Sequence, residues 1–204
     1  MPKYNIDDMV KELIQKEDEI LIKVGKENVY IYIFLMKEFK KGGILDNHVF
    51  QFVFKAFYQM NNPGFSKEQK KRFFQLLNQK QQNLDKIISD LYSIKKNIQF
   101  SFTTKLLHTI DTSKPIFDKY VGRSLKMGNL YGANQTRPKR IDLCLKKIDS
   151  CYELLTNRTQ ELLSRKEVQK MIEDFHKMYP NERQISDTKV LDFILWTYGK
   201  LDNK

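Results

Sequence analysis

Cysteine and histidine, which build most metal and redox sites, are scarce in this sequence. The 204 residues include two cysteines and three histidines. The cysteines do not cluster as zinc or iron–sulfur ligands do, and the histidines share no ligand spacing. Cys144 and Cys151 fall on one predicted helix, roughly 10 Å apart along its axis, which is too far for a disulfide within that helix. We therefore expect no metal site, no cofactor, and reduced cysteines that serve in packing.

Long apolar runs are missing as well. No run reaches the roughly 18 apolar residues of a membrane-spanning helix. The first residues, Met-Pro-Lys-Tyr-Asn-Ile-Asp-Asp, lack the apolar segment of a signal peptide. We expect a cytoplasmic protein with no membrane partner.

Acidic residues are outnumbered by basic ones. The chain has 36 Lys and Arg against 25 Asp and Glu, a net charge of +11. This excess favours an anionic partner such as nucleic acid or an acidic surface. The basic residues cluster after Asp118, around a segment at 127–136 with the composition of a loop. A solvated surface linker would have the same composition, so that interpretation stays open. As the binding residues for nucleic acid we predict Lys119, Arg123, Lys126, Tyr131, Arg137, Lys139 and Arg140.

Apolar residues recur at helical spacing along most of the chain, which predicts an all-α fold. The segment 28–41 also fits a buried strand, but the charged residues that continue it favour a helix. We expect a single compact domain, 1–204, of about eight helices, with a subdivision into 1–97 and 98–204 as the alternative. The predicted helices span 6–24, 28–41, 48–60, 66–94 with a break at the polar residues 78–83, 103–110, 119 onward, 138–179 with a break near 156–160, and 187–198.

Residues that favour N-caps and C-caps predict where these helices begin and end. Short polar side chains that cap helix starts stand at Asn47, Ser66, Asp118 and Ser186. Glycines, which often close a helix, stand at Gly25, Gly42, Gly43 and Gly199.

The segment 101–121 places a lysine and an aspartate where chain geometry brings them together. A helix that starts at Thr103 or Thr104 rises roughly 8 Å between Lys105 and its end at 1.5 Å per residue. A turn follows, and an extended stretch from Pro115 returns the chain by roughly 10 Å at about 3.3 Å per residue. Asp118 then lies level with Lys105. An ammonium group facing a carboxylate suits imine chemistry or the stabilisation of a cation. A plain helix cap and a solvated lysine would give the same pattern.

Two motifs in this segment resemble the helix-hairpin-helix DNA glycosylases. Pro115-Ile-Phe-Asp-Lys-Tyr-Val121 is similar to the Pro-Ile-Leu-Asp-Gly-Asn-Val element of that family. Thr104-Lys-Leu106 stands where bifunctional 8-oxoguanine glycosylases have Thr-Lys-Val. The glycines of the family's hairpin have no counterpart at 98–102. The string from Ser101 to Asp118 also resembles a group of uncharacterised bacterial proteins.

The resemblance to the glycosylases implies a glycosylase-like helical core and an activity on DNA. Lys105 would be the amine nucleophile that attacks the sugar C1′ at a damaged base or an abasic site. Asp118 would cap a helix and stabilise the positive charge that develops on the sugar. DNA is then the expected partner, ahead of RNA. The alternative is a helical factor without catalysis that binds nucleic acid or an acidic protein partner.

Overall fold

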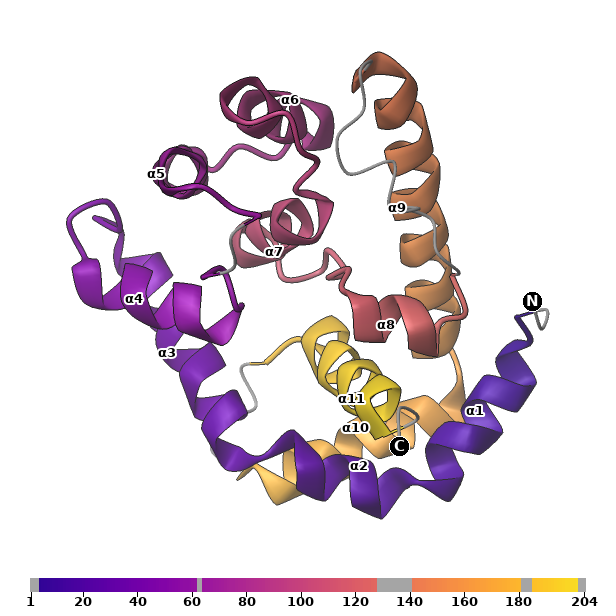
Figure 1. Ribbon diagram of the computed structural model, residues 1–204. Helices are drawn as coiled ribbons and strands as arrows, with labels where there is room; N and C mark the ends of the chain where they lie inside the picture. The colour runs from indigo at the N-terminus through magenta and orange to yellow at the C-terminus, as the bar shows by residue number, and fades with distance from the viewer. Residues whose placement is uncertain (1–3, 62–63, 128–140, 181–184, 202–204) are drawn as a thin grey trace. The chain divides into compact units, whose positions relative to one another are not determined.

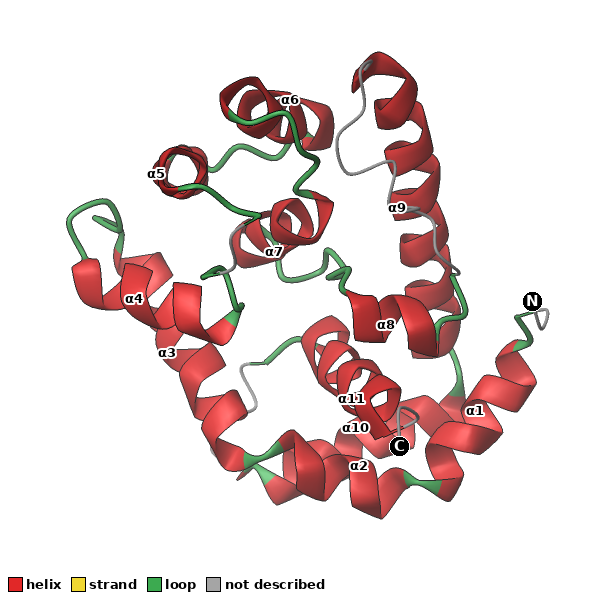
Figure 2. Ribbon diagram, in the orientation of Figure 1, coloured by secondary structure: helices red, strands yellow, loops and turns green. Residues whose placement is uncertain are grey.

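Helices account for all the regular structure in the part of the chain that the structure describes. The computed structural model describes residues 4–61, 64–127, 141–180 and 185–201. These ranges contain no strand (Figure 2), which confirms the all-α fold class. None of their helices is both long and apolar enough to cross a membrane. The eleven helices are α1 (Ile6–Gln15), α2 (Glu17–Val24), α3 (Lys26–Lys41), α4 (His48–Phe57), α5 (Lys67–Asn78), α6 (Leu84–Ile94), α7 (Phe100–Ile110), α8 (Lys119–Ser124), α9 (Ile141–Leu163), α10 (Lys166–Met178) and α11 (Asp187–Leu201).

The chain is divided into more helices than the expected number of about eight, because long helical segments are interrupted. Lys16 separates α1 from α2, and its backbone N–H donates to the last carbonyl oxygens of α1. Residues Ser164 and Arg165 separate α9 from α10. The break expected near 156–160 is therefore wrong. α9 runs through this stretch to Leu163, with Leu155 and Leu162 fully buried on either side of it, and the hydroxyl of Thr156 donates to the carbonyl oxygen of Tyr152 at 2.8 Å inside the same helix.

Helix starts follow the predicted caps. The Asn47 side chain accepts a hydrogen bond from the Phe50 N–H at 2.9 Å. Ser66 and Gln69 form a capping box at the start of α5. These bonds satisfy N–H groups that the first turn of a helix leaves unpaired. Gly25, between α2 and α3, has a φ of 76°, a left-handed value that fits its predicted place at a helix end.

The chain groups into two compact units, each built from segments far apart in the sequence. The α8 unit consists of Met1–Val29, Thr112–Leu130 and Cys151–Lys204, and the α7 unit consists of Tyr30–Asp111 and Tyr131–Ser150. The single domain expected from the sequence stays a prediction.

Aromatic side chains fill the core of the α7 unit. Phe54 of α4 packs against Phe73 and Phe74 of α5, with ring centroids 5.6 and 5.7 Å apart. All three side chains are buried. Gln69 is also fully buried, and its Nε2 donates to the carbonyl oxygen of Leu91 at 2.8 Å, which ties α5 to α6.

The α8 unit is organised by the close packing of α11 on α8 (Figure 1). A Cβ added at Gly199 would lie 2.4 Å from the carbonyl oxygen of Tyr120 and 2.6 Å from Ser124 Oγ. Glycine is needed there because the two backbones approach so closely. The hydroxyl of Ser124 donates to the carbonyl oxygen of Leu195 at 2.6 Å across the same contact. The prediction that Gly199 ends the last helix is wrong, since α11 continues to Leu201.

Candidate nucleic-acid interface

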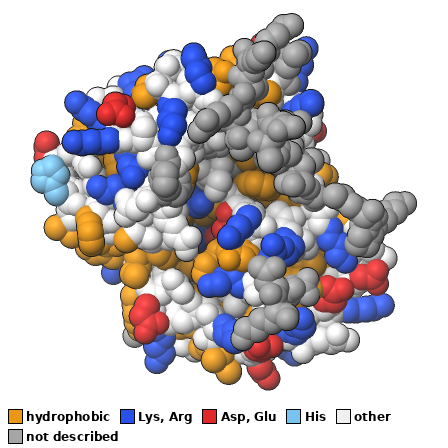
Figure 3. Space-filling view, in the orientation of Figure 1, with side chains coloured by type: hydrophobic (Ala, Val, Ile, Leu, Met, Phe, Trp, Pro, Cys, Tyr) orange, Lys and Arg blue, Asp and Glu red, His pale blue; other side chains and the backbone are white. Residues whose placement is uncertain are grey.

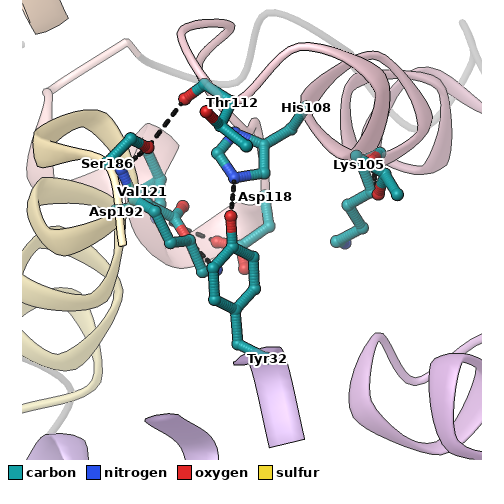
Figure 4. A network of polar contacts seen from close by, with 10 residues as sticks. Tyr32, Lys105, His108, Thr112, Asp118, Val121, Ser186 and Asp192 are labelled. Carbon is teal, nitrogen blue, oxygen red and sulfur yellow. Dashed lines mark hydrogen bonds and ion pairs between the residues drawn. The ribbon is translucent and has the colours of Figure 1, made fainter. Parts of the chain in front are cut away.

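Asp118 starts α8, as the sequence predicts. Its Oδ1 accepts hydrogen bonds from the N–H groups of Tyr120 at 2.8 Å and Val121 at 2.9 Å. The residue is extended, with φ −144° and ψ 178°, and its side chain is half-buried. Pro115 and Ile116 are buried just before it. Asp118 therefore holds the start of α8 at a fixed place in the α8 unit (Figure 4).

Lys105 is a buried lysine in the middle of α7. The expectation that Thr103 or Thr104 begins this helix is wrong, because α7 begins at Phe100. Lys105 Nζ donates to Ser101 Oγ at 2.8 Å and lies 5.1 Å from the ring centroid of Phe102. Its side chain is only 7% exposed, so it is not the solvated lysine of the alternative interpretation.

Lys105 belongs to the α7 unit and Asp118 to the α8 unit. Each side chain has a defined setting in its own unit, and the meeting of the two stays a prediction.

His108, one turn after Lys105, is a buried polar residue to which the sequence pattern assigned no role. It is fully buried, and its Nε2 lies 3.0 Å from the hydroxyl of Tyr32 in α3 (Figure 4). The contact joins α7 to α3 within the α7 unit. A histidine placed in this way serves packing and polar satisfaction.

Two helices of the α8 unit bring aromatic rings and cations together. Lys119 Nζ lies 4.7 Å from the ring centroid of Tyr120, and Arg123 Cζ lies 5.7 Å from it. The rings of Tyr120 and Trp196 meet edge to face, with centroids 6.0 Å apart and planes at 83°. Lys200 Nζ lies 4.1 Å from the Trp196 ring centroid. We call Lys119, Tyr120, Arg123, Trp196 and Lys200 the ring-and-cation cluster.

Helical spacing places the members of this cluster on two facing surfaces. Lys119 and Arg123 are four residues apart in α8, and Trp196 and Lys200 are four apart in α11, so each pair lies on one face of its helix. The three cations are exposed and the two rings are half-buried. Figure 3 shows Lys and Arg side chains, with hydrophobic ones between them, over the region where Figure 1 draws α8 and α11.

The predicted binding residues fall into three groups. Lys119 and Arg123 are in the cluster. Lys126 lies in the turn after α8, half-buried and with a φ of 48°, and is not among the residues that contact the two rings. The others lie outside the described residues and stay predictions: Tyr131, Arg137, Lys139 and Arg140.

The sequence analysis missed both members that come from α11, Trp196 and Lys200. The apolar pattern of the last helix marked it only as a core helix. A signal was present, because the only tryptophan of the chain stands four residues before a lysine. What that signal could not give is the position of α8, whose residues lie more than 70 positions earlier in the sequence.

A buried ion pair removes another cation of α11 from the surface. Lys189 Nζ lies 2.6 Å from Asp192 Oδ2, and the two side chains are 3% and 11% exposed. These buried charges compensate each other. Lys200 is therefore the exposed cation of α11.

A small cavity lies beside the cluster helices and is too small for a nucleobase. Its volume is ≈ 10 Å³, about the room that one water molecule needs. It is lined by Pro115, Ile116, Val121, Thr159, Thr188, Leu191, Asp192 and Leu195. A base bound by the cluster would therefore rest on the surface of the rings and would not enter this cavity.

Histidine, cysteine and acidic side chains form no group of three or more that could hold a metal ion within the described ranges. Cys144 and Cys151 are both free thiols on α9. Comparison of the chain with protein family models, curated proteins and solved structures gave no match in any of the three.

Proposed function

We propose that the chain binds nucleic acid through the ring-and-cation cluster. The observation that supports this most strongly is the setting of three exposed cations, Lys119, Arg123 and Lys200, around two aromatic rings. Cations that neutralise phosphates release condensed counterions, and this supplies much of the affinity for nucleic acid. Aromatic rings beside them offer flat surfaces to bases. The net charge of +11 adds a longer-range attraction for polyanions.

The proposal is tested by the fluorescence anisotropy of a labelled oligonucleotide over a range of salt concentrations. We expect the logarithm of the affinity to fall linearly and steeply with the logarithm of the salt concentration. The double variant Lys119→Gln with Lys200→Gln should bind more weakly, and its salt slope should be smaller by about one for each lost phosphate contact.

A matched control removes the same charge elsewhere. Lys67 and Lys71 are exposed on α5, also four residues apart. Lys67→Gln with Lys71→Gln should retain the affinity and slope of the wild type. The proposal fails if the wild type does not bind at low salt, which would favour an acidic protein partner. It also fails if the two double variants lose the same affinity.

A second candidate function is a glycosylase or lyase activity of Lys105 and Asp118. The burial of Lys105 among Ser101, Tyr58 and Phe102 favours it, because enzymes activate amine nucleophiles in desolvated surroundings. The amine would condense with the aldehyde of an abasic site to an imine, with loss of water, and borohydride would then reduce the imine to a stable adduct. We expect this adduct with the wild type and with the exposed-site control Lys67→Ala, and none with Lys105→Ala. An equal yield from Lys105→Ala would exclude Lys105 as the nucleophile.

A further inference from the structure

The aromatic rings of the ring-and-cation cluster bear on which form of nucleic acid it binds. We propose that it is a site for an unpaired base, so that the chain binds single-stranded nucleic acid in preference to duplex. The inference rests on the proposed function and adds the form of nucleic acid that the site takes. Trp196, the only tryptophan of the chain, is the central residue.

A base can displace the cations that lie over the rings. A cation–π contact at an exposed site is worth a factor of about two to five in an equilibrium constant. Stacking of a base on an aromatic side chain is worth about fivefold to a hundredfold. A base therefore displaces the ammonium of Lys200 from the Trp196 ring, 4.1 Å away. Lys200 is exposed on a long side chain, so its ammonium can then pair with a phosphate of the same strand.

Arg123 differs from the two lysines because it is tied to the helix contact. Its Nη1 donates to the carbonyl oxygen of Gly199 at 3.3 Å. This bond keeps its guanidinium beside Tyr120, whereas neither Lys119 nor Lys200 forms an ion pair or hydrogen bond of its ammonium group within the described part of the chain, so we expect both to move with the ligand. The cluster thus combines a guanidinium fixed by a hydrogen bond, that of Arg123, with the flexible side chains of Lys119 and Lys200.

The angle between the rings limits how many bases can stack. The planes of Tyr120 and Trp196 are 83° apart. Two neighbouring bases that lie parallel cannot stack on both rings. We expect one base on the face of Trp196, with the ring of Tyr120 at its edge. Every base has a flat face that can stack on an aromatic ring, so we expect the contact to tolerate any of the four bases.

A duplex cannot use this site in the same way. The faces of its paired bases are covered by the neighbouring base pairs, and exposing one base costs unstacking and unpairing. Duplex would therefore engage only the cations. The difference between strand forms is expected to depend on the rings.

The intrinsic fluorescence of Trp196 tests the inference directly, because no other tryptophan contributes to the signal. Binding is followed in parallel by the anisotropy of a labelled strand. We expect oligothymidine to quench Trp196 and to bind more tightly than a duplex of the same length. An abasic strand of equal charge should bind without this quenching and more weakly, by about fivefold to a hundredfold.

Two variants complete the test. Trp196→Leu should lose single-strand affinity by that same factor and keep its duplex affinity. Tyr30→Leu, which removes a tyrosine 53% exposed on α3 in the α7 unit, should change neither.

Single-strand binding without quenching, or equal affinity for the abasic strand, would overturn the base site and leave nucleic-acid binding by the cations. Both outcomes are measured on the wild type, so they test the base site even if Trp196→Leu does not fold. Absence of any anisotropy change would overturn the base site together with the proposed function.

Discussion

Asp118 caps α8 through one of its two carboxylate oxygens. Oδ1 accepts both backbone hydrogen bonds, from Tyr120 and Val121. An asparagine side chain offers an oxygen of the same geometry, whereas alanine offers none. The capping role of Asp118 can therefore be separated from the role of its charge.

Replacement of Asp118 should show this separation. We expect Asp118→Ala to lower the free energy of unfolding by about 0.5–2 kcal/mol through the loss of the cap, and Asp118→Asn to retain that contribution. Urea unfolding followed by circular dichroism measures both. If the abasic-site activity exists, Asp118→Asn should lose it while remaining folded. Equal stability of Asp118→Ala and the wild type would show that the cap contributes nothing.

Glu17 is a second residue whose charge has a measurable consequence. Its Oε1 is buried and has no hydrogen-bond partner among the described residues. Burial, and then the nearby carboxylate of Asp174, raise the pKa of Glu17 above its usual 4.5. The charged form is thus disfavoured in the folded protein.

The raised pKa of Glu17 makes the stability of the fold depend on pH. An acid with a raised folded pKa allows full stability below its unfolded pKa, near 4.5, and stability falls as the pH rises through the folded value. Glu17→Gln should therefore unfold at a higher urea concentration than the wild type at pH 7, and the gain should vanish at low pH. Glu167→Gln, an exposed change on α10, is the control. If Glu17→Gln gained the same stability at every pH, the charge of Glu17 would not be the cause.

Local sequence predicts single residues well only where their partners are near in the chain. The two N–H groups that Asp118 caps lie within three residues of it, and the turn chemistry and Pro115 before it mark the start of α8. The burial of Lys105 could not be predicted in this way, because Tyr58 contacts it from almost 50 positions away. The pairing of Lys105 with Asp118, predicted from the segment 101–121, stays a prediction because the two residues belong to different units.

At the scale of elements, the contact between α8 and α11 carries the candidate interface. Gly199 permits the close approach of the two helices, and the hydrogen bond from the Ser124 hydroxyl to the Leu195 carbonyl oxygen stabilises it. Both cations of α8 and the tryptophan of α11 are brought together by this contact. Its loss should separate the two halves of the cluster.

Gly199→Ala tests that contact. The added Cβ would meet the backbone of α8 at 2.4 Å, which no side-chain movement relieves. We expect a loss of about 1–3 kcal/mol in the free energy of unfolding, as for other overpacked sites. Gly122→Ala is the matched control within α8, because the atoms nearest to its Cβ would belong to the ring of Phe117, at 3.0 Å, and not to backbone. The ring can shift, and alanine favours the helix, so the control should lose less. Equal losses would refute the close-packing account.

The sequence predicted the helices better than the points where they break. Asn47 and Ser66 cap their helices as expected, because caps are local chemistry. The separation of α9 from α10 falls at Ser164 and Arg165, where no proline or glycine marks it. Gly199 was misread as a helix end because its close partner, Tyr120, lies far away in the sequence.

At the scale of the whole molecule, an excess of positive charge is distributed over a helical chain. The net charge of +11 indicates an anionic partner but no location for it. The clustering of cations after Asp118 predicted the contribution of α8 to the interface. The contribution of α11 required the tertiary contact. We therefore propose that nucleic acid binds this chain where α8 packs on α11.

Photochemical cross-linking of an iodouridine-substituted single strand, followed by peptide mapping of the full chain, tests this claim most directly. Iodouridine reacts on irradiation with aromatic side chains in contact with it. The account predicts cross-links in the peptides that contain Tyr120 and Trp196, and their loss in Trp196→Leu. Cross-links confined to the α7 unit would contradict it.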